Sequence, residues 1–290
     1  MKRGFLILNL SAGTGQKLKS HVASVICQFE HSGIDVVPSP TGPDGSVIHQ
    51  VRDLLRESPD LMVAWGGDGT INEVANGMFG SDVPLGVIPG GTANLFVREL
   101  KIPQSVSGAV KMIAAGKTRR ISVGQANGRY FLLMVGIGFD SAVVKNVDWN
   151  MKKRLGKFAF GISAWNTALQ YKFPQFHIHA NGEKKECVFA VICNAREYAA
   201  YFVLAPEADI SDEYFYVCLF KNPGIMSMTW YAFHALARTH EKLESVEVFR
   251  TTELEVTGPP ELAIQADGEL IGALPMKFRI HPRSLNVFCP

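Results

Sequence analysis

The sequence has 290 residues, which is long for a single hydrophobic core, so we expect two domains. Apolar residues make up 47% of the chain and charged residues 19%, a balance that suits a globular protein and argues against disorder. The formal net charge of +2 is too small to favour a nucleic-acid partner, and no apolar stretch approaches the roughly 18 residues of a membrane span. The five cysteines include no C-x-x-C pair, so we expect a cytoplasmic protein without disulfides or a zinc site.

Residues 1–122 repeat one pattern, in which a short apolar run leads into a turn and then into a helical segment. The apolar runs predict buried strands at 5–8, 34–37, 61–65 and 85–88. The segments after them predict helices at 17–30, 47–56, 71–79 and 93–99. Strands that alternate with helices indicate a doubly wound, mostly parallel sheet, and ligands of such sheets bind at the carboxyl ends of the strands.

Beyond residue 122, runs rich in β-branched and aromatic residues predict strands. These runs are 130–135, 176–180, 188–194, 214–220, 246–250, 253–257 and 277–280, with helices expected near 156–169 and 226–238. We therefore predict an α/β protein with a doubly wound, mostly parallel N-terminal sheet domain over 1–122 and a mostly-β, sandwich-like domain over 123–282. The last apolar run, within 283–290, either ends the second domain or returns to the first.

The strongest chemical pattern is G-G-D-G-T at 66–70, here called the first glycine turn, which lies between a predicted strand and a predicted helix. Its glycines let backbone N–H groups approach a ligand, and the helix N-terminus adds partial positive charge, so the turn suits phosphate. Because a carboxylate repels phosphate, we expect Asp68 to hold a metal ion or orient a hydroxyl. Thr70 and Glu73 match a T-x-x-E capping box, and a lone motif of this kind is more often structural than functional.

Two further turns share this setting, P-G-G-T at 89–92 (the second glycine turn) and N-L-S-A-G at 9–13. Any one of them could be turn chemistry alone, whereas three at the same edge of one sheet favour a ligand site. The chain contains neither a Walker A loop nor a dinucleotide G-x-G-x-x-G pattern.

Taken in order, these motifs resemble the diacylglycerol kinase catalytic-domain family, which includes bacterial lipid kinases, sphingosine kinases and ceramide kinases. In the first half the resemblance rests on N-x-S-x-G at 9–13, G-G-D-G-T-x-N-E-V at 66–74 and P-x-G-T-x-N-x-x-x-R at 89–98. In the second half it rests on G-x-G-F-D-S at 136–141, A-P-x-A at 205–208 and Q-x-D-G-E at 265–269. The ordered set covers nearly the whole chain and is more specific than any single motif.

The resemblance implies a two-domain kinase that uses ATP and Mg²⁺ to phosphorylate a lipid hydroxyl, as in diacylglycerol. The positions that match nucleotide-binding residues of relatives are Asn9, Thr41, Gly66, Gly67, Asp68, Gly69, Thr70, Ile71, Asn72 and Thr92. Asp267 and Glu269 match carboxylates taken as metal-positioning and as general base toward the lipid hydroxyl, with Asp68 as a further catalytic carboxylate. Without the resemblance, 267–269 would be interpreted as a hairpin turn.

One departure from the family pattern concerns a metal. Asp212-Glu213-Tyr214 stands where relatives often have Asp-Gly-Leu and where bacterial members place a structural metal ion. Asp212 keeps the carboxylate, and loss of the glycine argues against the site. Asp212 is therefore one candidate metal ligand, and Asp267 is a second through Mg-ATP.

The segment 145–157 is a candidate contact with a membrane surface. It carries Lys145, Lys152, Lys153, Arg154 and Lys157, and Trp149, Phe158, Phe160 and Trp165 lie in or beside it. Basic groups with interleaved aromatic ones suit anionic lipid. A solvated helix start with aromatic side chains in the core is an equally good interpretation, and both stay open.

Two other functions remain open at this point. NAD kinases also carry G-G-D-G-T, so a kinase for a soluble acceptor such as NAD is the nearest alternative. A non-catalytic relative that binds nucleotide or lipid is the second. The sequence does not identify the lipid or the oligomeric state.

Overall fold

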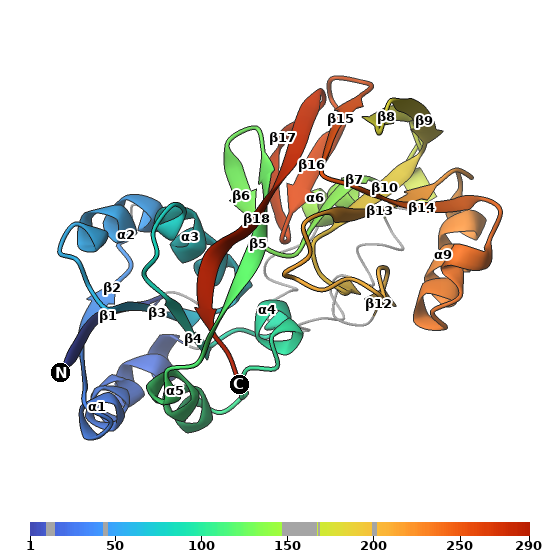
Figure 1. Cartoon of the computed structure of the whole chain (residues 1–290). Helices are drawn as coiled ribbons and strands as arrows, with labels where there is room; N and C mark the ends of the chain where they lie inside the picture. The colour runs from blue at the N-terminus through green and yellow to red at the C-terminus, as the bar shows by residue number, and fades with distance from the viewer. Residues whose placement is uncertain (10–14, 43–45, 147–166, 168, 199–201) are drawn as a thin grey trace. The chain divides into compact units, whose positions relative to one another are not determined.

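The computed structural model describes residues 1–9, 15–42, 46–146, 167, 169–198 and 202–290. The chain divides into two compact units (Figure 1), of which the first comprises Met1–Ile121 with Arg283–Pro290 and the second Ser122–Pro282. Most of the helix expected near 156–169 and most of the basic segment 145–157 lie outside the described residues. Within the described ranges, no helix is long and apolar enough to cross a membrane.

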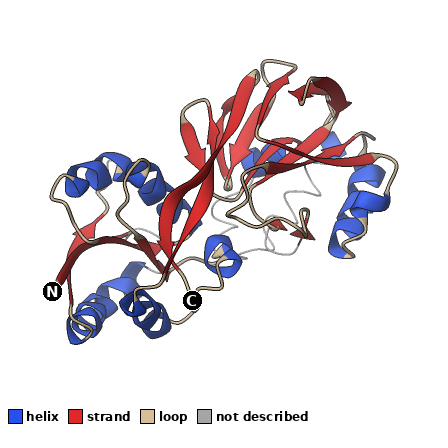
Figure 2. Ribbon diagram, viewed as in Figure 1, coloured by secondary structure: helices blue, strands red, loops and turns tan. Residues whose placement is uncertain are grey.

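The first unit is a parallel sheet with helices on both faces. Its elements in chain order are β1 (Lys2–Leu8), α1 (Gly15–His31), β2 (Ile34–Pro40), α2 (Val47–Leu55), β3 (Leu61–Gly66), α3 (Asp68–Met78), β4 (Leu85–Pro89), α4 (Leu95–Glu99) and α5 (Val106–Ala115). The strand order is β2-β1-β3-β4, and all three pairings are parallel. Helices α2 and α3 cover one face and α1 and α5 the other (Figure 2).

Burial along the strands follows from this layering. Every residue of β3 and of β4 is buried, as expected for strands that are covered on both faces. Helix α2 turns Val47 and Val51 inward, and its first turn is capped by Ser46, whose side chain accepts a hydrogen bond from the His49 N–H. The doubly wound, mostly parallel sheet predicted from the sequence is confirmed.

The second unit contains two antiparallel sheets that share a core. Its elements are β5 (Thr118–Ala126, which begins in the first unit), β6 (Arg129–Phe131), β7 (Met134–Gly138), α6 (Phe139–Asn146), β8 (Phe176–Ala180), β9 (Glu183–Cys187), β10 (Phe189–Cys193), β11 (Glu197–Tyr198), β12 (Phe202–Val203), β13 (Phe215–Phe220), α9 (Ile225–Leu236), a 3-10 turn (His240–Lys242), β14 (Val246–Thr251), β15 (Glu253–Thr257), β16 (Ala263–Ala266), β17 (Glu269–Ala273) and β18 (Met276–Phe288, which ends in the first unit). One sheet has the order β14-β13-β10-β7-β16-β17, and the other contains β18-β15-β8-β9 with β5 and β6.

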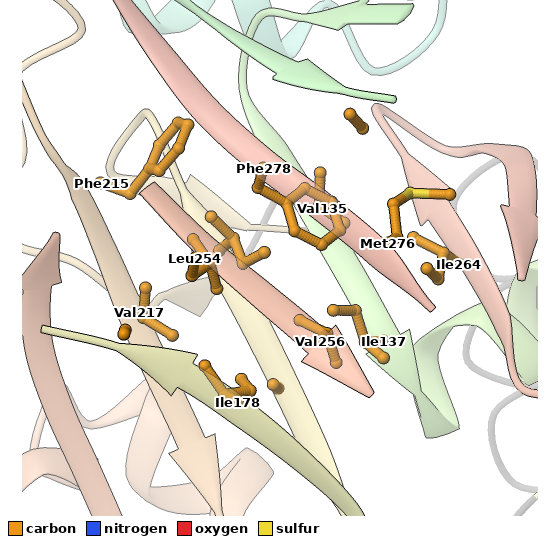
Figure 3. Close-up of a cluster of buried hydrophobic side chains, with 14 of the residues drawn as sticks. Val135, Ile137, Ile178, Phe215, Val217, Leu254, Val256, Ile264, Met276 and Phe278 are labelled. Atoms are coloured by element: carbon orange, nitrogen blue, oxygen red, sulfur yellow. The ribbon is translucent and has the colours of Figure 1, made fainter. Parts of the chain in front are cut away.

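The core of this unit is built by alternating side chains. On β8, Phe176 and Ile178 are buried and the intervening His177 is half-buried, the period-two pattern of a strand with one covered face. Figure 3 shows Ile178, Leu254 and Phe278 pointing toward Val135, Val217 and neighbours on the facing sheet. Two sheets that interdigitate in this way make a sandwich-like domain, so this part of the predicted fold class is also confirmed.

Three predicted apolar runs differ from the structure. The run 130–135 is not one strand, because β6 ends at Phe131 and β7 begins at Met134. The runs 277–280 and 284–288 are one strand, β18, whose start pairs antiparallel with β15 and whose end pairs parallel with β4. The short helix α6 and the helix α5 were not predicted.

Candidate functional site

The two glycine turns, and Asn9 from the third turn, lie at one edge of the parallel sheet, and residues 10–13 of that third turn lie outside the described residues. Asn9 follows β1, and its side-chain amide donates a hydrogen bond to the Thr70 hydroxyl at 3.4 Å. The Thr41 N–H, beyond β2, donates to the Leu8 carbonyl at 3.0 Å. These candidate nucleotide-binding residues therefore meet at the carboxyl ends of adjacent strands, and the exposed Thr92 follows β4 at the same edge.

The two glycine turns pack against each other, backbone to backbone. The Gly90 N–H donates to the Gly66 carbonyl at 2.8 Å. A Cβ on Gly91 would lie 2.6 Å from the Gly67 Cα, and one on Gly90 would lie 3.1 Å from the Gly66 Cα. None of the four has a positive φ, so close approach and not a left-handed backbone favours glycine here; a Cβ on Gly66 would meet the Thr70 side chain, and those on the other three would meet the facing turn. The motif alone had suggested only close approach to a ligand.

Asp68 connects the first glycine turn to helix α4. Its carboxylate accepts a hydrogen bond from the Phe96 N–H at 3.1 Å, in the first turn of α4. Burial raises the pKa of the Asp68 carboxyl, and the backbone N–H groups of Phe96, Leu95 and Asn94 oppose that rise. The side chain therefore acts as a capping group for a helix that follows the other glycine turn.

The capping box expected at Thr70 and Glu73 is wrong. Helix α3 begins at Asp68, with Gly67 at the N-cap, so Thr70 lies inside the first turn. Gly67 has no side chain that could satisfy the first N–H groups of α3, which leaves them directed at the turn. A helix N-terminus of this kind attracts anions.

The side chains of Ile71 and Asn72 are buried and are not exposed at this edge of the sheet. Ile71 is fully buried, and Asn72 is 5% exposed. The Asn76 side-chain amide donates to both the backbone and the side-chain oxygen of Asn72, which fixes Asn72 within α3. Both residues support the first turn of α3 from the core.

In the second unit, Asp267 fastens a hairpin to the start of β7. It lies in the turn between β16 and β17 with φ of 49°, and its carboxylate accepts hydrogen bonds from the N–H groups of Leu132, Leu133 and Met134 at 2.7, 2.9 and 3.0 Å. The N–H groups of Leu132 and Leu133 are thus bonded to a side chain and not to a neighbouring strand, which accounts for the break between β6 and β7 in the predicted strand 130–135.

Glu269 stands two residues further on, in a different environment. Its side chain is 44% exposed and forms an ion pair with Arg129 on β6. Sequence reasoning missed Arg129, because the two residues are far apart in the chain and no motif includes the arginine. The carboxylate of Glu269 is thus paired with a cation and still partly open to solvent.

A buried polar chain joins two of the sequence motifs, G-x-G-F-D-S and Q-x-D-G-E. The Gln265 side-chain amide donates to Asp140 at 2.5 Å, and its oxygen accepts from the Gly268 N–H at 2.8 Å. Burial raises the pKa of the Asp140 carboxyl, while hydrogen bonds with Tyr198 and Gln265 lower it. A Cβ on Gly136 would lie 1.8 Å from the Asp140 carboxylate, so only glycine fits there.

This series of hydrogen bonds fixes the hairpin turn between β16 and β17. Because Asp140 accepts from the amide nitrogen of Gln265, the amide oxygen must face Gly268, which lies between Asp267 and Glu269. The Ser141 hydroxyl adds a second tie, since it donates to the Gly136 carbonyl and accepts from the Gln265 N–H. Asp140 and Gln265 were not among the candidate site residues predicted from the sequence.

Asp212, the other candidate metal ligand, lies in a tight turn. Its carboxylate accepts from the Asp209 N–H at 2.9 Å, and the Asp209 carboxylate accepts from the Ser211 N–H at 2.9 Å. Both carboxylates are thus bonded to backbone of their own turn. Among the described residues, no group of three His, Cys, Asp or Glu side chains is placed to hold a metal ion.

Comparisons with known proteins match each of the two units to a known family. Residues 3–126 match the family described as Diacylglycerol kinase catalytic domain, and residues 133–289 match the YegS C-terminal NAD kinase beta sandwich-like domain. Diacylglycerol kinases of Bacillus subtilis and Staphylococcus aureus are 29% and 28% identical to the chain, over all of it and over 97% and 93% of their own lengths. A crystal structure of a diacylglycerol kinase from Bacillus anthracis has a TM-score of 0.81 at 22% identity, covering 100% of this chain and 97% of that one.

The chain therefore belongs to the diacylglycerol kinase-like family, with a kinase catalytic domain followed by the YegS-type β-sandwich domain. The resemblance inferred from the ordered motifs is confirmed.

We expect Gly91→Ala to destabilise the first unit by about 1–3 kcal/mol, because the added Cβ must push the two glycine turns apart. Denaturant unfolding measures the change. Gly42→Ala is the matched control, since a Cβ there meets nothing within 4 Å. Equal stability of Gly91→Ala and Gly42→Ala would contradict the proposed contact between the turns.

We also expect stability to depend on pH through Asp140. Its pKa is raised in the folded state, so its contribution to stability is full below the ordinary value of 3.8 and is lost as the pH rises through the folded-state pKa. Asp140→Asn should remove this loss, and the wild type should weaken relative to the variant as the pH rises above 3.8.

Unfolding free energies measured across a series of pH values test this expectation. Asp53→Asn, at an exposed carboxylate of α2, controls for the loss of one surface charge. Wild-type and Asp140→Asn curves that run parallel over the whole range would show that the folded state does not favour protonated Asp140.

Proposed function

We propose that this protein is an ATP-dependent lipid kinase that transfers the γ-phosphoryl group of ATP to a lipid hydroxyl, as in diacylglycerol. The observation that best supports this function is the pair of packed glycine turns beside the N-terminus of α3, in a chain of the diacylglycerol kinase-like family. Phosphoryl transfer depends mainly on positioning and on neutralisation of phosphate charge, which backbone N–H groups at a helix end supply in part.

The nucleotide contacts that we propose are divided between backbone and side chains. The backbone of 66–70 would bind phosphate, and the side chains of Asn9, Thr41 and Thr92 would hold the rest of the nucleotide. Ile71 and Asn72 are buried, so they support the turn and do not reach the ligand by their side chains.

Mg²⁺ fits this proposal as an ion that arrives with ATP. It usually keeps several waters and binds one or two carboxylates plus phosphate oxygens, so it does not need a preformed cluster of protein ligands. When bound, it neutralises charge on the phosphates. We propose that Asp68 and Asp267 are mainly positioning residues here, since each carboxylate already accepts backbone hydrogen bonds.

Glu269 is the general base that we propose. Its side chain is 44% exposed, whereas the Asp267 carboxylate is bonded to three backbone N–H groups, and the Asp140–Gln265–Gly268 hydrogen bonds hold the turn in place. Arg129 would release it when the acceptor hydroxyl binds. We place the reaction in the cytoplasm, because ATP is supplied there. A lipid acceptor then requires peripheral contact with a membrane surface.

A kinase for a soluble acceptor such as NAD is the second candidate. The observation that favours it is the match of residues 133–289 to a domain described as NAD kinase beta sandwich-like. Labelled ATP incubated with a panel of lipids in mixed micelles, and with NAD as a soluble acceptor, separates the two. We expect label in a lipid; label in NAD alone would support the second candidate, and label in no acceptor would indicate a non-catalytic relative.

We expect Glu269→Gln to reduce kcat on the lipid by about 10²–10⁴-fold, because glutamine keeps the shape of the side chain but cannot take up a proton. Nucleotide affinity, measured by calorimetry, should be unchanged. Glu261→Gln is the matched control, an exposed glutamate on the turn before β16. Near-normal turnover by a folded Glu269→Gln protein would remove this residue from the mechanism.

A further inference from the structure

Helix α9 carries an apolar face that the second unit leaves uncovered. Four of its side chains, Met226, Trp230, Phe233 and Leu236, are 84%, 54%, 61% and 57% exposed. Trp230 and Phe233 stack on each other with ring centroids 5.9 Å apart. At 3.6 residues per turn, Met226, Trp230 and Phe233 fall on one side of the helix.

The opposite side of α9 attaches the helix to its own unit. Met228, Tyr231 and Ala235 are buried there, and the Tyr231 ring lies 4.9 Å from that of Phe220 on β13. The Tyr231 hydroxyl accepts from the Asn222 N–H and donates to the Ser245 carbonyl. The helix is therefore fixed by one apolar face and presents a second one outward, at the margin of this unit (Figure 1).

The near absence of charged residues on and around α9 favours a lipid surface as its partner. Helix α9 contains no Asp, Glu, Lys or Arg, and between Asn222 and His240 the sole residue of these types is Arg238. Arg238 is exposed and makes no ion pair with another described residue. An apolar helix face with tryptophan and an unpaired cation at its end suits the boundary between lipid headgroups and acyl chains, where tryptophan is favoured. Glu241 and Glu244 follow beyond the helix.

The size of the face distinguishes a lipid surface from a second copy of the chain. Four half-exposed side chains of this size offer roughly 500 Å² of area. A stable protein interface needs about 800 Å² on each partner, and a largest apolar patch of about 300–600 Å² on a protein of this kind is often functional.

We propose that α9 inserts its Met226, Trp230 and Phe233 face into the surface of an anionic lipid bilayer. This inference rests on the proposed lipid kinase function, because a membrane-bound acceptor requires such a contact. The contact involves none of the residues assigned to the chemistry.

The double variant Trp230→Ser/Phe233→Ser tests this contact. Its partition onto vesicles of phosphatidylcholine with phosphatidylglycerol should fall at least tenfold, and its KM for a vesicle-embedded acceptor should rise. Its kcat on a short-chain lipid presented as a monomer should stay at the wild-type value. Val37→Ser, an exposed apolar residue on β2, is the matched control and should partition like the wild type.

A second variant keeps the test valid if the double variant does not fold. Trp230→Phe retains an aromatic ring, and it should reduce the tryptophan quenching that brominated acyl chains cause in the wild type, by the share that Trp230 contributes among the four tryptophans. Unchanged partition of the folded double variant, or unchanged quenching in Trp230→Phe, would overturn the proposal. So would a wild-type dimer in light scattering that the double variant converts to a monomer with no change in partition.

Failure of the proposed function would give a different result. If no lipid were phosphorylated in any form but wild-type partition still depended on Trp230 and Phe233, the lipid contact would stand and the kinase reaction would fall. If lipid were phosphorylated while partition did not depend on Trp230 and Phe233, the kinase function would be supported and the α9 contact would be wrong.

Discussion

The close contact between the two glycine turns constrains the whole candidate nucleotide site. Gly66 and Gly67 at the end of β3 lie against Gly90 and Gly91 at the end of β4, so closely that a Cβ on Gly91 would lie 2.6 Å from the Gly67 Cα. Because the turns touch, Asp68 in the first can cap helix α4, which follows the second. The same arrangement leaves the N-terminus of α3 without a side-chain cap, and a phosphate is the natural partner for such a helix end.

In the second unit, polar groups with little exposure fix the geometry of the hairpin turn. A buried carboxylate and amide are costly unless each hydrogen bond is made, so Asp140, Gln265 and the Gly268 N–H specify one geometry. Asp267 does the same for the opposite end of the turn by accepting three N–H groups. The hairpin turn is therefore held at both ends, and this accounts for the co-occurrence of two motifs that lie far apart in the sequence.

Environment separates the carboxylates into different roles. Asp68, Asp140 and Asp267 accept hydrogen bonds from groups of the protein and are tied to fixed positions. Glu269 is half-exposed and pairs with the half-exposed Arg129. A group that must take a proton from a substrate has to be reachable, so the half-exposed Glu269 carboxylate is the better candidate for a base, and the carboxylates tied by protein hydrogen bonds suit positioning.

The sequence by itself determined the alternation of strands and helices, the two sheet types and the family, because hydrophobic period and glycine turns are local properties of the chain. The burial of every residue of β3, and the alternation of buried and half-buried side chains on β8, could both be predicted in this way. Only the tertiary structure decided that Gly91 touches Gly67, that Asp68 caps α4, that Arg129 pairs with Glu269, and that Asp267 interrupts the strand predicted at 130–135. Each of these contacts joins residues that are distant in sequence, and no local pattern specifies which partner a backbone N–H or a carboxylate will meet once the chain is folded.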